Sequence, residues 1–360
     1  MKQLRVAILG QGRSGRDIHG AHIRADGRFR VVAVVDPLAE RRARARDEYN
    51  LGEGDVYPSV EGLYGRADVD LAVNATPSLL HQPLALDLMR HGCHVLQEKP
   101  IAATAAQVDE LAEVSRQTGR QLLIFLQSRY APQFVKVREI AQSGALGRLV
   151  QIKLTTSGFG RRWDWQTLQE NVAGSLYNTG PHPLGQALEL MDCYDEMPSV
   201  FCRMDRVNTF GDAEDFVKLI LTAPGRPLVE VEVSGCDGYV PYTFHIQGSC
   251  GSLIADSVAI RWKCFQPDEA PPQRLIREPL TNAQGLPSYC VEQLPWREFS
   301  WEQPNVVDNV FASATRRLYD DVYACLAEGG RPNVTIHQVR QQIEIIEEAH
   351  RQNPMRRLHG

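Results

Sequence analysis

Hydrophobic and polar positions follow two alternating periods in the first third of the chain. Short apolar runs, several rich in valine and leucine, indicate buried strands. They lie at 5–9, 30–36, 70–75, 93–97 and 121–125. Between them, apolar residues three and four positions apart predict helices, which end at Gly52, Gly92 and Gly119. Strands that alternate with helices predict a doubly wound parallel sheet with helices on both faces.

The pattern changes after residue 126. Helical spacing at 132–144 and 176–191 is combined with many strand-like runs, at 148–157, 200–207, 215–221, 228–233, 243–247 and 252–255. Strands with few helices between them predict an α+β domain built on a mostly antiparallel open sheet.

The last hundred residues contain three further features. The proline-rich stretch 266–304 predicts a long excursion, and helices are expected at 306–328 and 336–352. We therefore expect an α/β protein with a nucleotide-binding domain over 1–126. A substrate-binding and oligomerisation domain is expected over 127–360.

Composition and charge exclude several classes of function. The formal net charge is -5 and no long basic run occurs, so a nucleic-acid partner is not expected. No apolar stretch reaches the roughly 20 residues that span a bilayer, which argues against a membrane partner. No signal peptide precedes the first strand, so a cytoplasmic location is expected. The eight cysteines form no C-x-x-C pair, and no metal site is expected.

A glycine-rich turn follows the first predicted strand directly and opens a helix. Its G-x-G-x-x-G spacing is formed by Gly10, Gly12 and Gly15, with Arg13 and Ser14 between the last two. Glycines permit a tight turn, let backbone amides approach a pyrophosphate and allow close packing of helix on strand. The helix N-terminus then favours the negative phosphates. These five residues are the predicted phosphate-binding part of a Rossmann domain.

The choice of dinucleotide depends on Asp36, which ends the second predicted strand. A carboxylate at that point accepts hydrogen bonds from the adenosine ribose hydroxyls and repels a 2′-phosphate. Asp36 therefore favours NAD over NADP. Arg41 and Arg42 are a signal for the opposite preference, because a nearby arginine can hold that phosphate.

Polar residues also follow the later strands of the predicted parallel sheet. Thr76 and Pro77 follow the third strand, and His81 begins the next helix. Glu98 and Lys99 follow the fourth. Ligands of such sheets bind beyond the carboxyl ends of the strands. We therefore expect Thr76, Pro77, His81 and Glu98 to contact the cofactor, with Lys99 beside them.

These motifs together resemble the Gfo/Idh/MocA family, which includes glucose–fructose oxidoreductase and inositol dehydrogenases. The resemblance rests on the glycine fingerprint, the Ala-Thr-Pro run with His81, and Gly-Cys-His-Val-Leu-Gln-Glu-Lys-Pro at 92–100. Segments 174–182 and 246–253 are similar to two later family motifs. The resemblance implies an NAD(P)-dependent oxidoreductase that transfers hydride at a hydroxyl or keto carbon of a sugar or inositol-like polyol. It also implies a homo-oligomer, a dimer or tetramer, formed through the C-terminal sheet.

The resemblance also implies the two catalytic residues. The lysine that matches Lys99 lies beside the nicotinamide and the reacting oxygen, and the histidine that matches His182 exchanges the proton. The chemistry of the side chains agrees with this, because histidine titrates near neutrality and an ammonium group stabilises negative charge on oxygen.

One position departs from the family pattern, and other functions stay open because of it. Asn178 stands where the family usually has aspartate. It shares one helix face with His182, or a new helix begins at Gly180–Pro181. An asparagine can bind substrate but cannot act as a base. Two alternatives are therefore an NAD-dependent glycoside-cleaving enzyme and a non-catalytic sensor of cofactor and sugar.

Three further side chains are candidates for substrate binding. Trp163 and Trp165 lie in a loop after the strand at 148–157, a region that covers the nicotinamide and substrate in the family. Aromatic faces suit stacking on sugar rings. The equal alternative is that one of the two tryptophans packs in the domain interface. Arg129, after the last strand of the first domain, is also expected to reach the cleft.

Overall fold

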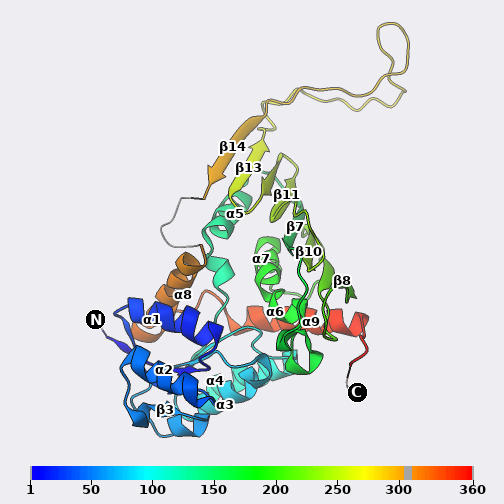
Figure 1. The fold of residues 1–360 in the computed structure, drawn as a ribbon. Coiled ribbons are helices and arrows are strands. Elements are labelled where there is room, and N and C mark those ends of the chain that lie inside the picture. Colours follow the sequence, from blue (N-terminus) through cyan, green and yellow to red (C-terminus); the bar gives the residue numbers. More distant parts are fainter. Residues whose placement is uncertain (1, 304–309, 359–360) are drawn as a thin grey trace.

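The computed structural model describes residues 2–303 and 310–358 of the chain. Figure 1 shows two sheet-containing parts, with the N-terminal part below and the second sheet rising beside helix α7 (Pro181–Met191). Both parts contain helices and strands, and the predicted fold class is confirmed. Within the described residues, no helix is long and apolar enough to cross a membrane.

The first sheet has six parallel strands in the order β3-β2-β1-β4-β5-β6. The order reverses between β1 and β4, and this switch point is where open α/β sheets bind ligands. The strands are β1 (Leu4–Leu9), β2 (Phe29–Val35), β3 (Val56–Tyr57), β4 (Leu71–Asn74), β5 (His94–Gln97) and β6 (Leu122–Ile124). The sequence did not predict β3, since two residues carry no periodicity.

Helices connect these strands. The helix predicted after the glycine turn begins as a π-helical segment, η1 (Arg13–Gly20), and continues as α1 (Ala21–Ala25). The others are α2 (Ala39–Tyr49), α3 (His81–Arg90) and α4 (Ala105–Thr118). Helix α4 begins with a capping box, in which the Thr104 hydroxyl accepts from the Gln107 backbone amide, and it ends at the predicted Gly119 with φ +65°. The short 3₁₀ turns are η2 (Glu53–Asp55), η3 (Val60–Leu63) and η4 (Ser78–Leu80).

The second sheet has eight strands in the order β14-β13-β12-β11-β7-β10-β9-β8. Only β7 and β10 pair in parallel, and the other neighbours are antiparallel. The strands are β7 (Leu149–Ser157), β8 (Ser199–Asp205), β9 (Phe216–Thr222), β10 (Leu228–Ser234), β11 (Phe244–Gly248), β12 (Gly251–Ala255), β13 (Ala259–Cys264) and β14 (Arg297–Glu302).

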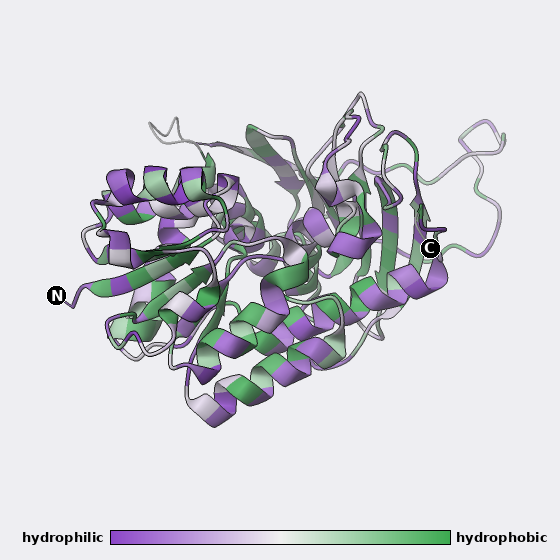
Figure 2. Ribbon diagram, turned by 60° about the horizontal axis from the view of Figure 1, so that its bottom comes forward, coloured by the Kyte–Doolittle hydropathy of each residue, from purple (hydrophilic) through white to green (hydrophobic). Residues whose placement is uncertain are grey.

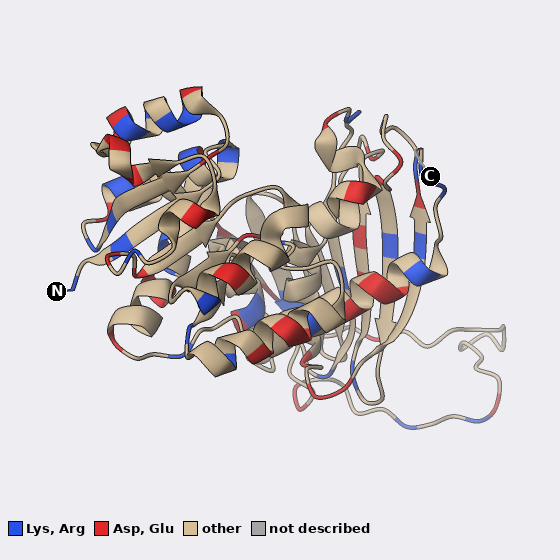
Figure 3. Ribbon diagram, turned by 90° about the horizontal axis from the view of Figure 1, so that it is seen from below, with Lys and Arg blue, Asp and Glu red and all other residues tan. Residues whose placement is uncertain are grey.

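Side chains alternate across this sheet as a half-buried sheet requires. Residues such as Val229 and Val231 are buried toward helices α5 (Pro132–Gln142) and α7. The opposite side of β9 and β10 carries Lys218, whose ammonium pairs with Glu230 and Glu232. Figure 3 shows charged residues of both signs along these strands.

The prediction of a long excursion over 266–304 is wrong for the C-terminal part of that stretch. Strand β14 lies inside that stretch and pairs along its whole length with β13, another strand that the sequence did not predict. Prolines precede β14 and hide its short alternating pattern, Arg-Glu-Phe-Ser-Trp-Glu. The remaining excursion, between Cys264 and Arg297, extends away from the sheet edge (Figure 1). Position 304 lies outside the described residues.

The two C-terminal helices join the domains. Helix α8 (Val310–Ala327) buries Leu318 and Tyr319 in the same apolar cluster as Leu4 and Phe29 of the first sheet, although it belongs to the predicted second domain. The expected start of this helix at 306 lies outside the described residues. Helix α9 (Ile336–Gln352) packs against α4 and β8, and its mixed hydropathy in Figure 2 fits a helix with one buried face.

Candidate active site

The glycine turn lies between the ends of β1 and β4. Gly10 has φ +84°, and a Cβ there would be 2.5 Å from the Ala75 carbonyl oxygen. A Cβ on Gly15 would be 1.7 Å from the Gly10 carbonyl oxygen. Around Gly12 there is open space, with only the Arg41 guanidinium 3.9 Å from a Cβ position. The turn is therefore closed on the protein side and open at Gly12, as a phosphate cradle requires.

The two other predicted residues of this turn differ in exposure. Arg13 is exposed and Ser14 is half-buried. The Arg13 charge is close enough to contribute to lowering the pKa of Lys99. The glycine turn and the predicted catalytic lysine therefore lie near each other, at the carboxyl edge of the first sheet.

Asp36 is buried at the end of β2 and holds the glycine turn. One of its oxygens accepts from the Gln11 backbone amide at 2.8 Å, and the other accepts from the Leu38 amide at 2.9 Å. The Arg41 guanidinium lies 3.5 Å from the same carboxylate. Arg42 donates to the Asp36 and Pro37 carbonyl oxygens. The carboxylate and both arginines therefore surround the point where the sequence predicts the adenosine ribose.

The turn after β4 is fixed by a buried histidine. Both ring nitrogens of His81 face carbonyl oxygens, Pro100 at 2.6 Å and Thr76 at 2.8 Å. Burial lowers the pKa of His81. Both ring nitrogens are occupied and the side chain is 2% exposed, so this arrangement offers no free ring atom for the expected contact of His81 with a cofactor, which stays a prediction. His81 instead ties the Thr76–Pro77 turn to the turn that follows Lys99.

Glu98 is also turned away from the cleft. Its side chain is buried, and one oxygen lies 3.4 Å from the Nε2 of His19. Its other oxygen accepts the backbone amide of Lys99 at 3.2 Å. Both carboxylate oxygens of Glu98 thus lie against groups of the protein, and its expected contact with the cofactor stays a prediction.

Lys99 extends from the end of β5 toward the second domain. Its Nζ donates to the Asn178 backbone carbonyl at 2.6 Å and to the Asn178 side-chain oxygen at 3.3 Å. Burial lowers the pKa of Lys99, and the Glu98 carboxylate acts against this. Arg13 and Arg162 lower the pKa further.

A short chain of polar groups fixes Asn178. Its side-chain oxygen also accepts from the Gln166 amide at 3.2 Å, and the Gln166 oxygen accepts from Arg162 at 2.5 Å. Asn178 ends helix α6 (Ser175–Asn178), and α7 begins afresh at Pro181. The open question of one or two helices is thus resolved in favour of a new start, which Pro at the first position stabilises.

His182 lies in the first turn of α7, and its Nδ1 is 3.1 Å from the Ser128 hydroxyl. Burial and the charge of Lys99 lower the pKa of His182 to about 3, although Glu98 acts in the opposite direction. The ring is therefore neutral at pH 7 in this structure and does not titrate near neutrality as expected. A neutral imidazole can still accept a proton.

A cavity of about 540 Å³ begins at His182 and Ser128 and extends along the second sheet. Its wall is rich in hydroxyl and other polar groups, among them Thr156, Ser157, Tyr242, Asp256 and Ser257. Such groups suit a small ligand that carries many hydroxyls.

The three further candidates for substrate binding, Trp163, Trp165 and Arg129, differ in their exposure to solvent. Trp163 is 78% exposed and Trp165 is 43% exposed, so neither packs in a domain interface. Both lie in the segment that supplies Arg162 and Gln166. Arg129 is 8% exposed, and its guanidinium pairs with Glu189 at 2.6 Å and donates to Gln338. These partners hold the Arg129 guanidinium inside the second domain, and its expected substrate contact stays a prediction.

Several residues of the site were not predicted from the sequence. Asn74 and Gln97 are buried at the ends of β4 and β5 and bond to each other at 3.0 Å. Gln166 and Ser128 contact the two central residues, Asn178 and His182. Asn74 and Gln97 could have been found, because each is a polar residue at the end of an apolar strand. The sequence contains no comparable sign for Gln166 and Ser128.

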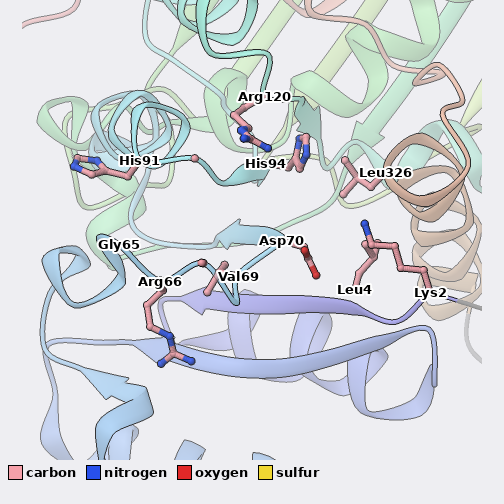
Figure 4. Close-up of a pocket in the computed structure, with 12 residues that line it drawn as sticks. Lys2, Leu4, Gly65, Arg66, Val69, Asp70, His91, His94, Arg120 and Leu326 are labelled. Atoms are coloured by element: carbon pink, nitrogen blue, oxygen red, sulfur yellow. The ribbon is translucent and has the colours of Figure 1, made fainter.

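Another hollow lies on the opposite edge of the first sheet. Figure 4 shows Lys2, Asp70, His94 and Arg120 around a cavity of about 510 Å³ at the amino ends of β1, β4 and β5. Asp70 is engaged by Arg5. Ligands of open α/β sheets bind at the carboxyl edge, so this cavity is not the candidate active site. No cluster of metal-ligating side chains occurs among residues 2–303 and 310–358.

The lowered pKa of His182 predicts a pH-dependent stability. Below pH 6.5 the unfolded chain binds a proton at this histidine and the folded chain does not, until the pH reaches about 3. The free energy of unfolding should therefore decrease as the pH is lowered below 6.5, by up to about 1.4 kcal/mol per pH unit from this group. Urea unfolding at neutral pH and at pH about 5 measures the slope. His182→Gln should show a smaller slope, and equal slopes would contradict the burial of a neutral ring.

Comparison with known proteins identifies the family. Residues 4–126 match the Gfo/Idh/MocA model of an oxidoreductase family with an NAD-binding Rossmann fold. Residues 134–254 match the C-terminal domain of the same family. The two matches together cover more than half of the chain.

Individual relatives agree with this. An uncharacterized oxidoreductase of Schizosaccharomyces pombe is 23% identical over 377 residues, which cover 98% of this chain and 97% of that protein. The D-glucoside 3-dehydrogenase of Escherichia coli is 28% identical over 194 residues, 52% of this chain and 54% of that protein. The structure of GenD2 from gentamicin A biosynthesis, in complex with NAD, has a TM-score of 0.78 and 19% identity, and covers 100% of this chain and 97% of that one. The chain belongs to the Gfo/Idh/MocA family of oxidoreductases and contains its NAD-binding Rossmann domain.

Proposed function

We propose that this protein transfers hydride between NAD(H) and a hydroxyl or keto carbon of a sugar or cyclic polyol. One observation carries the proposal: the Lys99 ammonium, held by Asn178, lies near the glycine turn, and His182 lines a cavity whose wall includes several hydroxyl groups. A cation, a neutral imidazole and a polar cavity are the groups that oxidation of an alcohol needs.

Each of these residues has a distinct role in the proposal. Lys99 donates a hydrogen bond to the reacting oxygen and stabilises negative charge on it. His182, neutral at pH 7, accepts the proton that the hydroxyl loses and returns it in the reverse direction. Asn178 orients Lys99 and supplies no charge. A nicotinamide, when bound, supplies the carbon that accepts or donates hydride.

The substrate class follows from the cavity wall and from one relative. Hydroxyls at Thr156, Tyr242 and Ser257 and the carboxylate of Asp256 can each bond to a sugar hydroxyl. The exposed Trp163 and Trp165 offer flat faces for the ring. The E. coli relative is named a glucoside dehydrogenase, which supports a sugar as substrate.

The test is the absorbance of reduced nicotinamide when purified protein is mixed with NAD or NADP and a panel of inositols, aldoses and glycosides. We expect a signal with NAD and with a small group of these compounds. Silence across the panel, with bound cofactor already present in the purified protein, would favour glycoside cleavage through transient oxidation. Binding of cofactor and sugar without any reaction would favour a sensor.

The preference for NAD depends on the Asp36 carboxylate in this proposal. Asp36→Asn removes the charge that repels a 2′-phosphate and leaves Arg41 and Arg42 in place. The ratio of the NADP to the NAD dissociation constant should fall by about tenfold, about 1.4 kcal/mol. Quenching of protein fluorescence measures both constants without a substrate. Arg41→Gln is the matched control and should change the ratio in the opposite direction, while an unchanged ratio in Asp36→Asn would contradict the assignment.

We also infer self-association, as a dimer or tetramer, through the outward face of the second sheet. Lys153, Lys218, Glu230 and Glu232 form an ion-pair network on that face. In a symmetric dimer the same patch lies on both subunits, so charges of both signs on this face allow it to pair with a second copy of itself.

A further inference from the structure

Three polar side chains from distant parts of the chain meet behind Lys99. His19 lies on η1, the segment that follows the glycine turn, Glu98 follows β5, and Tyr319 lies on α8. The Nδ1 of His19 is 2.8 Å from the Tyr319 hydroxyl, and its Nε2 is 3.4 Å from Glu98. His19 and Tyr319 are fully buried, and Glu98 is 6% exposed.

The surroundings of this group keep Glu98 ionised. Burial would raise the pKa of the Glu98 carboxyl, but His19 and the Lys99 ammonium outweigh burial and lower its pKa to about 2. The His19 ring also packs on Phe125 with ring centroids 4.4 Å apart, which leaves it little freedom to move. A buried carboxylate is costly unless it is paired, so a fixed anion next to a catalytic lysine needs an explanation.

The Glu98 carboxylate acts on the side chain of its neighbour, Lys99. Burial and two arginines, Arg13 and Arg162, favour the uncharged amine, and the Glu98 carboxylate supplies a negative charge that favours the ammonium. Glu98 also accepts the backbone amide of Lys99, which fixes the start of its side chain. The same carboxylate thus sets both the place and the charge of the lysine.

We propose that Glu98, held by His19 and Tyr319, is a positioning residue that keeps Lys99 charged and directed at the cleft. This rests on the proposed role of Lys99. His19 stands on the segment that the glycine turn opens, so the support of the lysine and the cofactor cradle share one element. The C-terminal helix α8 completes the support, which explains why it packs on the first domain.

The test measures the charge of Lys99 without any substrate. The whole protein is labelled with trace acetic anhydride over a range of pH, and mass spectrometry follows the peptide that contains Lys99. Only the uncharged amine reacts, so the midpoint of the curve reports its ionisation. In Glu98→Gln the midpoint should move to lower pH by about one unit, since an opposite charge has been lost nearby.

Two variants separate this role from general packing. Tyr319→Phe removes the hydroxyl that holds His19 and should shift the midpoint in the same direction by less. His22→Gln is the matched control, because His22 stacks on the Tyr319 ring at 4.3 Å and contacts Asp26 rather than Glu98. Its midpoint should equal that of the wild type.

The outcomes are distinct. If Glu98→Gln is folded and leaves the midpoint unchanged, the proposal is overturned. If Glu98→Gln does not fold, Tyr319→Phe decides, and an unchanged midpoint there overturns the proposal. Because labelling needs neither sugar nor turnover, failure of the proposed reaction leaves this result intact.

Discussion

Lys99→Met is expected to lower turnover by about a hundred- to a thousandfold while the affinity for NAD stays nearly unchanged. Methionine keeps the length of the side chain and removes the charge that stabilises the reacting oxygen, and loss of one such donor costs this much. The ammonium contacts Asn178 across the cleft and takes no part in the glycine turn. Steady-state rates measure the first quantity, and fluorescence quenching by NAD measures the second.

The control for this variant is Lys136→Met. Lys136 lies on α5 and pairs with Glu139, remote in the fold from the hydrogen bonds of Lys99. Its rates should match the wild type. If Lys99→Met lost NAD binding together with turnover, or failed to fold, Lys99 would be a structural residue and the proposed chemistry would lose its main support.

Gly15→Ala is expected to destabilise the first domain by about 3 kcal/mol or more and to abolish NAD binding. The new methyl carbon would lie 1.7 Å from the Gly10 carbonyl oxygen, a backbone atom that cannot move without opening the turn. A Cβ on Gly10 would likewise lie 2.5 Å from the Ala75 carbonyl oxygen, so the turn has no room to shift in that direction. Urea unfolding measures the free energy of unfolding, and fluorescence quenching measures the affinity for NAD.

Gly12→Ala separates the loss of stability from the loss of NAD binding. Its Cβ position has only the Arg41 guanidinium 3.9 Å away, so the variant should fold with normal stability. It should still bind NAD weakly, since the methyl group occupies the space where the pyrophosphate approaches the backbone. Normal NAD binding in both variants would show that the turn does not hold a dinucleotide.

Much of the fold could be predicted because buried parallel strands and amphipathic helices leave clear periods in a sequence. All predicted strands of the first sheet are present, and capping signals such as Thr104 and Gly119 placed helix ends correctly. β3 is too short to leave a pattern, and β14 is hidden beside prolines. The packing of α8 on the first sheet is a long-range contact between residues about 300 positions apart, such as His19 and Tyr319.

The site could be predicted less completely, because the side-chain direction of a polar residue is set by tertiary contacts. Glu98 and His81 stand at strand ends where ligands bind, yet both turn inward to buried partners. Arg129 follows the last strand and is held by Glu189. Lys99 and Asn178, which come from the two domains, bond to each other, a contact that the sequence did not predict. Gln166 and Ser128 carry no motif that could have revealed them.

The central claim is a hydride transfer between this protein's nicotinamide and a sugar carbon, and an isotope measurement tests it most directly. The protein is incubated with NAD and a mixture of inositols, aldoses and glycosides that carry deuterium on carbon, and the recovered cofactor is examined by mass spectrometry. We predict reduced cofactor that carries deuterium at the nicotinamide C4, and its formation should depend on Lys99. Cofactor that is bound by the protein and recovered free of deuterium would contradict the proposed function.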